Sequence, residues 1–458
     1  MARTLSFHKR RLLTLPVTTL VQTAGSFLRP PNEAPARTRV FTPWVTFWLF
    51  LAQVLSHAQT CREAVRQAQG WFRARQAREF SSNTSAYCQA RARLPQAHLD
   101  KALAGVVRHL DAQETARFPG RRVRVVDGSS CSMPDTAANQ DRYPQPSGQT
   151  PGCGFPVMRF VALFSLATGA LLASASGPLS EHERTLWRQL WDVLAREDIV
   201  LADRGFCSFA EYCLLLQRGV DCVMRLHACR GKGGVRKIKR LAKGDWLVEW
   251  VKTTVRPKWM EKAHWDKLPK TLRVRHVTIS VAIPGFRTKS LTVATTLLDA
   301  TAYPAEALAD LYRRRWHIEL FLRDIKITMG MDVLRCKTPA LVQKEFTMHL
   351  IAYNLVRSLM LEAATRQDKD PARLSLAGAV AAIRQWAPTF MVFHSPAKRR
   401  DQFDAFLRCL ANDTVPHRPN RVEPRARKRR PKNYPLLNKP RNKFKEIPHR
   451  SKYKKTLS

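Results

Sequence analysis

The sequence predicts a mixed α/β protein in which a sheet-containing core is interrupted by a strand-rich insertion. Two observations predict this fold class. Short β-branched runs alternate with helical segments between residues 119 and 300, whereas helical periodicity dominates on both sides. From Pro416 onward, 16 of 43 residues are Lys or Arg. The predicted regions are a helical domain (1–118), a first core segment (119–227), a β-rich insertion (228–300), a second core segment (301–365), C-terminal helices (366–415) and a basic tail (416–458).

The overall charge indicates a polyanionic partner. Lys and Arg number 78 against 36 Asp and Glu, a formal charge of +42, and nucleic acid is the first candidate for such an excess. None of the ten cysteines forms a CxxC pair, which disfavours a structural zinc site. The most apolar run, residues 44–55, is too short to span a bilayer. We therefore expect a cytoplasmic protein with reduced thiols and no membrane partner.

The amino-terminal region is predicted to be helical. Helices are expected over 44–55, from Thr60-Cys-Arg-Glu63 (a capping box) to Trp71, from Asn83 or Ser85 to Arg93, and over 98–110. Arginines gather on these helices: Arg62, Arg66, Arg73, Arg75, Arg78, Arg91 and Arg93. A DNA-binding domain is favoured over a packing domain with solvated arginines, because arginine far outnumbers acid here. The sequence does not indicate which helix enters a groove.

Two aspartates follow predicted strands of the core. Strand Val123–Val126 is expected to end at Asp127-Gly-Ser-Ser, and strand Ile199–Ala202 is followed by Asp203-Arg-Gly-Phe. The glycine after Asp127 would let a phosphate or a metal approach. The other elements expected here are strands 157–166, 170–176 and 221–226, and helices 181–195 and 208–218. This order of elements is ribonuclease-H-like, with Asp127 and Asp203 side by side in the sheet.

The insertion is basic and strand-rich. Residues 246–253, 272–283 and 290–297 alternate with period two. Residues 230–234 form a basic, glycine-rich stretch that lacks the Gly-Lys-Ser/Thr of a P-loop, and we expect a DNA-facing loop there.

Residues 311–333 are expected to form one long helix, with Asp310 as its cap. Tyr312, Arg315, Glu319 and Lys326 fall within roughly 60° of one another on the helical wheel. They border an apolar stripe made of Leu311, Ile318, Leu322, Ile325 and Met329. By itself the pattern also fits an amphipathic helix with an i,i+4 Arg–Glu pair, worth a few tenths of a kcal/mol.

The spacing Tyr-x2-Arg-x3-Glu-x6-Lys resembles the signature of one subclass of DDE transposases of bacterial insertion sequences, as do the two aspartate motifs. The resemblance covers about residues 120–365. It implies that Asp127, Asp203 and Glu319 are catalytic and hold two Mg²⁺ ions, for which Mn²⁺ can substitute. It also implies that Tyr312, Arg315 and Lys326 contact DNA phosphates near the cut.

The resemblance further implies a reaction and its partners. Water cuts one strand at the element's end, the freed 3′-hydroxyl forms a hairpin on the opposite strand, and after hairpin opening it attacks target DNA. A tryptophan of the insertion stacks on a flipped base, and Trp246, Trp250, Trp259 and Trp265 are equal candidates. The partners are double-stranded DNA, both element ends and target, and a second copy of the chain in the DNA complex. A bacterial, nucleoid-associated protein is expected.

The carboxyl-terminal region continues with helices and ends in the tail. Helices are expected over 340–364, 374–386 and 401–410. The tail carries only two acids, Glu423 and Glu446, and many prolines, so we expect it to be disordered without a partner and to bind DNA.

Three other functions fit some features of the sequence. A recombinase using Tyr312 covalently would leave both aspartates unexplained. A non-catalytic DNA-binding protein from a decayed transposase would explain the charge. A ribonuclease-H-like nuclease without strand transfer would share the carboxylates.

Overall fold

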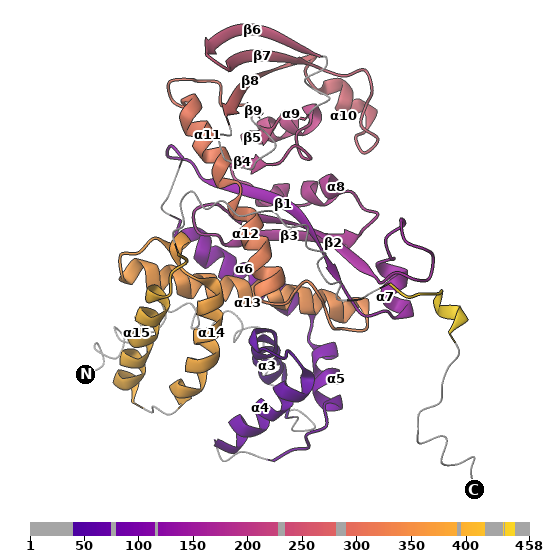
Figure 1. Cartoon of the computed structure of the whole chain (residues 1–458), viewed down its shortest axis with the longest axis vertical. Coiled ribbons are helices and arrows are strands. Elements are labelled where there is room, and N and C mark those ends of the chain that lie inside the picture. The colour runs from indigo at the N-terminus through magenta and orange to yellow at the C-terminus, as the bar shows by residue number, and fades with distance from the viewer. Residues whose placement is uncertain are drawn as a thin grey trace.

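The structure is a computed structural model that describes residues 40–74, 79–114, 118–227, 234–280, 290–391, 395–416, 434 and 436–444. One mixed sheet of nine strands, in the order β3-β2-β1-β4-β5-β9-β8-β7-β6, runs through its centre. Helices α12 and α13 lie against the β1–β3 end of this sheet, and a helical unit projects beyond them (Figure 1). The mixed α/β class predicted from the sequence is confirmed.

The core strands lie where the alternating patterns placed them. β1 pairs with β2 in antiparallel fashion and with β4 in parallel, and β5 extends the sheet parallel to β4. Gly169, with φ of +67°, makes the tight connection between β2 and β3. The bounds are β1 Val123–Ser132, β2 Val157–Ser165, β3 Leu171–Pro178, β4 Ile199–Ala202 and β5 Asp221–Arg225, with helices α7 Ala137–Arg142 and α9 Phe209–Gln217.

The strands of the insertion continue the same sheet. β9 (Ser290–Thr295) pairs with β5, and β8 (Thr271–Ser280) and β7 (Asp245–Val251) follow it. An additional strand, β6 (Val235–Ala242), forms the outer edge of the sheet. It was not predicted, because its run of basic residues shows no strand pattern. The short helix α10 covers Lys262–Lys267. Residues 230–233 of the glycine-rich stretch and 281–283 of the predicted strand lie outside the described residues.

Four amino-terminal helices confirm the helical prediction for this region of the chain. They are α3 Pro43–Leu55, α4 Cys61–Ala74, α5 Ser85–Arg93 and α6 Gln96–Ala112. Thr42 caps α3, and the Thr60 hydroxyl accepts a hydrogen bond from the Glu63 amide as the capping box requires. Thr84 is the N-cap of α5, while the neighbouring Asn83 side chain accepts from the Ser85 amide. Helices α3 to α5 share a small core of their own, made of Phe41, Leu49, Ala64, Val65, Ala68, Tyr87 and Ala90.

The prediction of one uninterrupted helix over 311–333 is wrong. Helix α11 (Ala305–Arg314) begins before Asp310, which therefore is no cap, and it ends two residues before α12 (His317–Arg323). A π-helical turn, Asp324–Thr328, follows α12, and the chain leaves it at Gly330 with φ of +75°. A π turn inserts one extra residue into the helical repeat, so the wheel drawn for an ideal helix does not hold beyond Arg323.

One further helix prediction needs correction. Residues 181–195 form only a short helix, α8 (Glu183–Arg188), and a 3₁₀ turn over Trp191–Val193. The rings of Trp187 and Trp191 meet edge to face, at 77°. The side chain of Val193 is exposed.

The carboxyl-terminal helices are present as predicted, with bounds that differ from the predicted ones by a few residues. They are α13 Pro339–Arg366, α14 Leu376–Trp386 and α15 Pro396–Asn412. Helix α13 packs on the sheet, where the buried Asn354 amide bonds both the amide and the carbonyl of Leu171. Most of the tail lies outside the described residues. The amides of Leu437 and Arg441 donate to the carbonyls of Cys153 and Gly152 in the loop after α7, and the Arg441 side chain pairs with Asp135, just before α7.

Candidate active site

The register of β1 and β4 brings Asp127 and Asp203 to the same level of the sheet. Val125 pairs with Leu201 in the parallel ladder, and each aspartate lies two residues further along its own strand direction. Equivalent positions of neighbouring parallel strands are about 4.8 Å apart and face the same side. The two carboxylates therefore lie close together, and each accepts a hydrogen bond from a glycine amide, that of Gly128 or Gly205.

The strand does not end at Asp127, which corrects the sequence analysis. β1 continues to Ser132, paired with β2 alone, because β4 stops at Ala202. Gly128 is packed against a side chain, since a Cβ at this position would lie 2.6 Å from the carboxyl carbon of Glu183. The neighbour of this glycine is thus a fourth carboxylate, at the start of α8.

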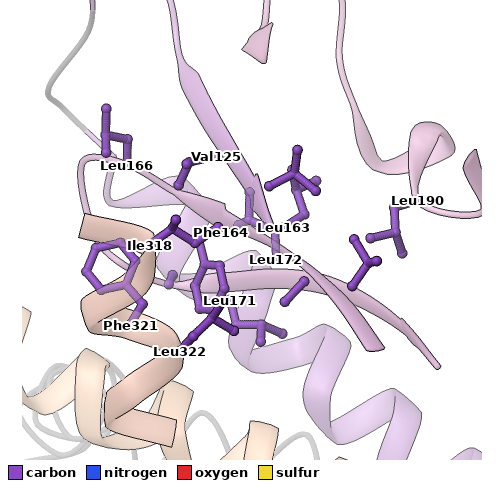
Figure 2. Packing of buried hydrophobic residues seen from close by; sticks show 14 of the residues in the cluster. Val125, Leu163, Phe164, Leu166, Leu171, Leu172, Leu190, Ile318, Phe321 and Leu322 are labelled. Carbon is purple, nitrogen blue, oxygen red and sulfur yellow. The ribbon is translucent and has the colours of Figure 1, made fainter. Parts of the chain in front are cut away.

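Helix α12 delivers Glu319 to the same side of the sheet. Its apolar face packs on β1, β2 and β3, with Ile318 and Leu322 buried against Phe164 and Leu171 (Figure 2). Figure 1 shows α12 crossing these strands. The five residues of the predicted apolar stripe are all buried, as expected. Glu319 follows Ile318 directly and keeps 39% of its side chain exposed.

Arg315 interacts electrostatically with both Glu319 and Asp127. Its guanidinium donates to the Glu319 carboxylate at 3.1 Å, which confirms the predicted i,i+4 pair, and its charge acts on Asp127. Burial, together with the like charges of Asp203 and Glu183, raises the pKa of Asp127 to about 6, against the lowering effects of the Gly128 amide and Arg315. Tyr312 is buried, and burial raises its pKa to about 12 while the charges of Arg315 and Asp203 act on it.

Lys326 reaches the site from the π-helical turn. Its ammonium donates to the Ser129 hydroxyl at 3.0 Å, two residues beyond Asp127 on β1. Ser129 and Asp127 share a face of the strand because side chains alternate. All six candidate residues are thus brought to one region: Asp127, Asp203, Tyr312, Arg315, Glu319 and Lys326.

The carboxylates are not gathered into one coordination shell. Within the described ranges, no three His, Cys, Asp or Glu side chains are arranged to hold one metal ion. Glu319 pairs with Arg315, whereas Asp127 lies close enough to Asp203 for the charge of Asp203 to act on it. Their donor chemistry, carboxylate oxygen, is that of Mg²⁺ or Mn²⁺ sites.

The four tryptophans of the insertion have different surroundings. Trp250 and Trp265 are core residues, and Trp246 is half-buried under the ammonium of Lys237, 4.5 Å from its ring centroid. Trp259 is 41% exposed, with the Arg188 guanidinium 4.0 Å from its ring centroid. It lines a cavity of about 300 Å³ whose other walls include Arg184, Ser208, Val255, Arg256 and Lys258.

Helix α8 joins this cavity to the carboxylates. Glu183 contacts Gly128, while the next residue, Arg184, lines the cavity, and Arg188 covers Trp259. Sequence reasoning missed Glu183, Ser129 and Arg184. The only signal for Ser129 was its position two residues after Asp127, and Glu183 and Arg184 had none, since nothing in the sequence brings 183–184 to 127.

Comparison with known proteins identifies the family. The Transposase DDE domain family matches residues 118–355, just over half of the chain. The protein is a DDE transposase. This transposase is 29% identical over 327 residues, 70% of each chain, to the transposase InsG for insertion sequence element IS4 of Escherichia coli (strain K12). It is 37% identical over 65 residues, 14% of its length and 18% of the relative's, to the transposase for insertion sequence element IS421 of Escherichia coli.

A solved structure also aligns with the transposase. The piggyBac transposase synaptic complex with hairpin DNA gives a TM-score of 0.44 at 9% identity, over 90% of this chain and 88% of that one. Among the described residues, no helix of the transposase is long and apolar enough to cross a membrane.

Proposed function

We propose that this transposase moves an insertion sequence by a cut-and-paste route, with Asp127, Asp203 and Glu319 as its catalytic carboxylates in a ribonuclease-H-like core. The observation that carries the proposal is the β1–β4 register, which sets two aspartates side by side, together with α12, which brings Glu319 to them. The strand order β3-β2-β1-β4-β5 supports the ribonuclease-H-like assignment.

The three carboxylates would hold divalent Mg²⁺ or Mn²⁺, which, when bound as a pair, stabilises the attacking and leaving oxygens of an in-line displacement at phosphorus. Asp127 must be ionised for this, and its raised pKa places that ionisation near pH 6. Glu319 must leave Arg315, which then becomes free to pair with a DNA phosphate through its planar donors. Lys326, which extends from the π-helical turn to Ser129 on β1, adds a second cation near the carboxylates.

Tyr312 acts through Arg315 in this proposal. Because Tyr312 is buried, it offers little surface to DNA, and its ring lies 5.8 Å from the Arg315 guanidinium. A covalent role for this phenol is disfavoured further by its pKa of about 12, which keeps it protonated.

The cavity at Trp259 supports the hairpin route. An exposed indole, a neighbouring cavity and three lining cations (Arg184, Arg256 and Lys258) form a site for an unstacked base and its phosphate. Trp259 is therefore our choice among the four tryptophans. Arg188 covers one side of its ring, and a base would stack on the other.

Helix α4 is our choice for gripping the element's ends. Arg62, Arg66 and Arg73 are exposed and lie within about 40° of one another, over about 16 Å of helix. The opposite face carries Ala64, Val65 and Ala68 into the small core, so the arginine face points outward. A helix of this width fits the major groove. Arg75 and Arg78 lie outside the described residues.

The test compares Glu319→Gln with the wild type on a labelled element end in Mg²⁺. The matched control is Glu306→Gln, which removes the same charge at an exposed position of α11. We expect the Glu319 variant to bind the end but neither to nick it nor to form hairpins, and the control to do both. Equal nicking by both variants would overturn the assignment. Joining to target DNA separates a transposase from a nuclease.

Both element ends must be cut for the element to move, and we propose that two copies of the chain pair them. Crosslinking on end-containing DNA, with free protein as the reference, tests this. The dimer assignment fails if one copy suffices for cleavage of both ends.

A further inference from the structure

The outer edge of the sheet carries the densest positive charge among the described residues of the insertion. Five of the nine residues from Val235 to Lys243 are Lys or Arg, and none is acidic. The cations of this basic edge are Arg236, Lys237, Lys239, Arg240 and Lys243, and all five are exposed. A solvated strand normally exposes one face, whereas β6 exposes both.

Neighbouring acids do not neutralise the basic edge. Asp245 is buried in an ion pair with Arg275, whose Nε lies 2.8 Å from its carboxylate. Glu249, opposite Arg236 in the ladder, pairs with that guanidinium at 3.9 Å and so offsets one of the five cations. Trp246 holds cations on its ring, with Lys237 4.5 Å and Arg240 5.9 Å from the centroid. The basic edge therefore keeps most of its positive charge, and the Trp246 ring fixes the position of two of its cations.

The backbone of β6 argues against another strand as its partner. Its register with β7 shifts between Lys237 and Lys239 and again between Arg240 and Ala242, so two residues bulge from the ladder. Bulges and edge lysines both prevent strands from adding to a sheet. A second copy of the chain would also bring the same positive charge. The occupant must be a polyanion that needs no backbone pairing.

We propose that the basic edge binds the phosphate backbone of duplex DNA without reading its sequence. β6 spans about 25 Å, enough for its side chains to reach phosphates on both sides of a groove. It lies five strand spacings from β4, which is about 24 Å along the sheet, or about seven base pairs of DNA. In Figure 1, β6 and α4 lie at opposite ends of the molecule. The proposal rests on the proposed function, because the distance is counted from the proposed cut.

The test measures how DNA affinity depends on salt. The patch variant changes Arg236, Lys237, Lys239 and Arg240 to Gln. The control variant changes four exposed cations elsewhere, Lys369, Lys398, Arg400 and Arg408, and so removes the same charge. Each phosphate contact contributes about 0.9 to the slope of log K against log salt. On duplex without element ends, the patch variant should lose up to about 3.6 from this slope, and the control should keep the wild-type slope.

Phosphate ethylation interference then locates the contacts. On end-containing DNA, ethylation of phosphates about seven base pairs from the cut should weaken binding by the wild type but not by the patch variant. The position of the interfering phosphates identifies the DNA that the basic edge binds: the element itself, the DNA flanking it, or a separate target duplex. Equal slopes for patch and control variants would overturn the proposal. The Glu319→Gln result is independent of this slope, so either proposal can fail alone.

Discussion

Removing the negative charge of Asp127 should stabilise the metal-free protein at alkaline pH. The folded chain raises the pKa of this carboxyl from 3.8 to about 6, chiefly through burial. At 1.36 kcal/mol per pH unit, keeping it ionised above pH 6 costs at most about 3 kcal/mol. Because the folded pKa is the higher one, this cost is absent below pH 3.8 and grows as pH rises to 6. Asp127→Asn keeps the oxygen that accepts from the Gly128 amide and removes the cost.

Urea unfolding in EDTA, followed by tryptophan fluorescence, measures the effect. The free energy of unfolding of the variant should exceed that of the wild type by up to about 3 kcal/mol at pH 8 and by about 1 kcal/mol at pH 4.5. Asp310→Asn, which breaks an exposed pair with Arg313, is the control and should change stability by less than about 1 kcal/mol at either pH. Mg²⁺ should stabilise the wild type but not Asp127→Asn. A gain that is equal at both pH values, or a loss at pH 8, would refute the reasoning.

Three other perturbations have expected outcomes. Trp259→Ala should slow hairpin formation by the 1–3 kcal/mol of a base–aromatic stack, about 5- to 150-fold, and leave first-strand nicking intact; gel analysis of the two products decides this. Gly169→Ala should lower the free energy of unfolding by about 1–3 kcal/mol, because its φ is +67° and a Cβ would meet the Arg357 guanidinium, and urea titration checks it. Arg315→Ala removes a charge that lowers the pKa of Asp127, so the acid limb of the nicking rate should move to higher pH; an unchanged limb contradicts the placement of Arg315.

Much of the core could be predicted because its signals are local. β4 is four consecutive apolar residues followed by Asp203, and the next helix, predicted from residue 208, has Ser208 as its cap. The stripe of α12 is buried because its period is helical as far as Leu322. The placement of Asp127 beside Asp203 was expected from the ribonuclease-H-like order of elements, in which the first and fourth strands are neighbours.

What failed depends on contacts between distant segments. The predicted helix is interrupted at Arg315 and forms a π turn after Arg323. Neither place contains Pro or Gly, so no residue type in the sequence indicated a break. β6 was missed because an edge strand exposed on both sides has no alternation to detect. Glu183 could not be linked to Asp127, since only the folding of α8 onto the sheet brings them together.

The pairing of Arg315 with Glu319 explains how the acidic site can fold without metal. Burial raises the pKa of Asp127, the like charges of Asp203 and Glu183 raise it further, and an unpaired Glu319 would add another negative charge nearby. Arg315 supplies a cation within the same turn of helix, and α12 can dock on the sheet before any ion arrives. In the proposed function, divalent ions held by the carboxylates would take over this neutralising role, and the guanidinium would be free to hold a DNA phosphate. One arginine would then serve folding in the free protein and substrate binding in the loaded one, and its spacing of four residues from the glutamate is what lets it reach that carboxylate.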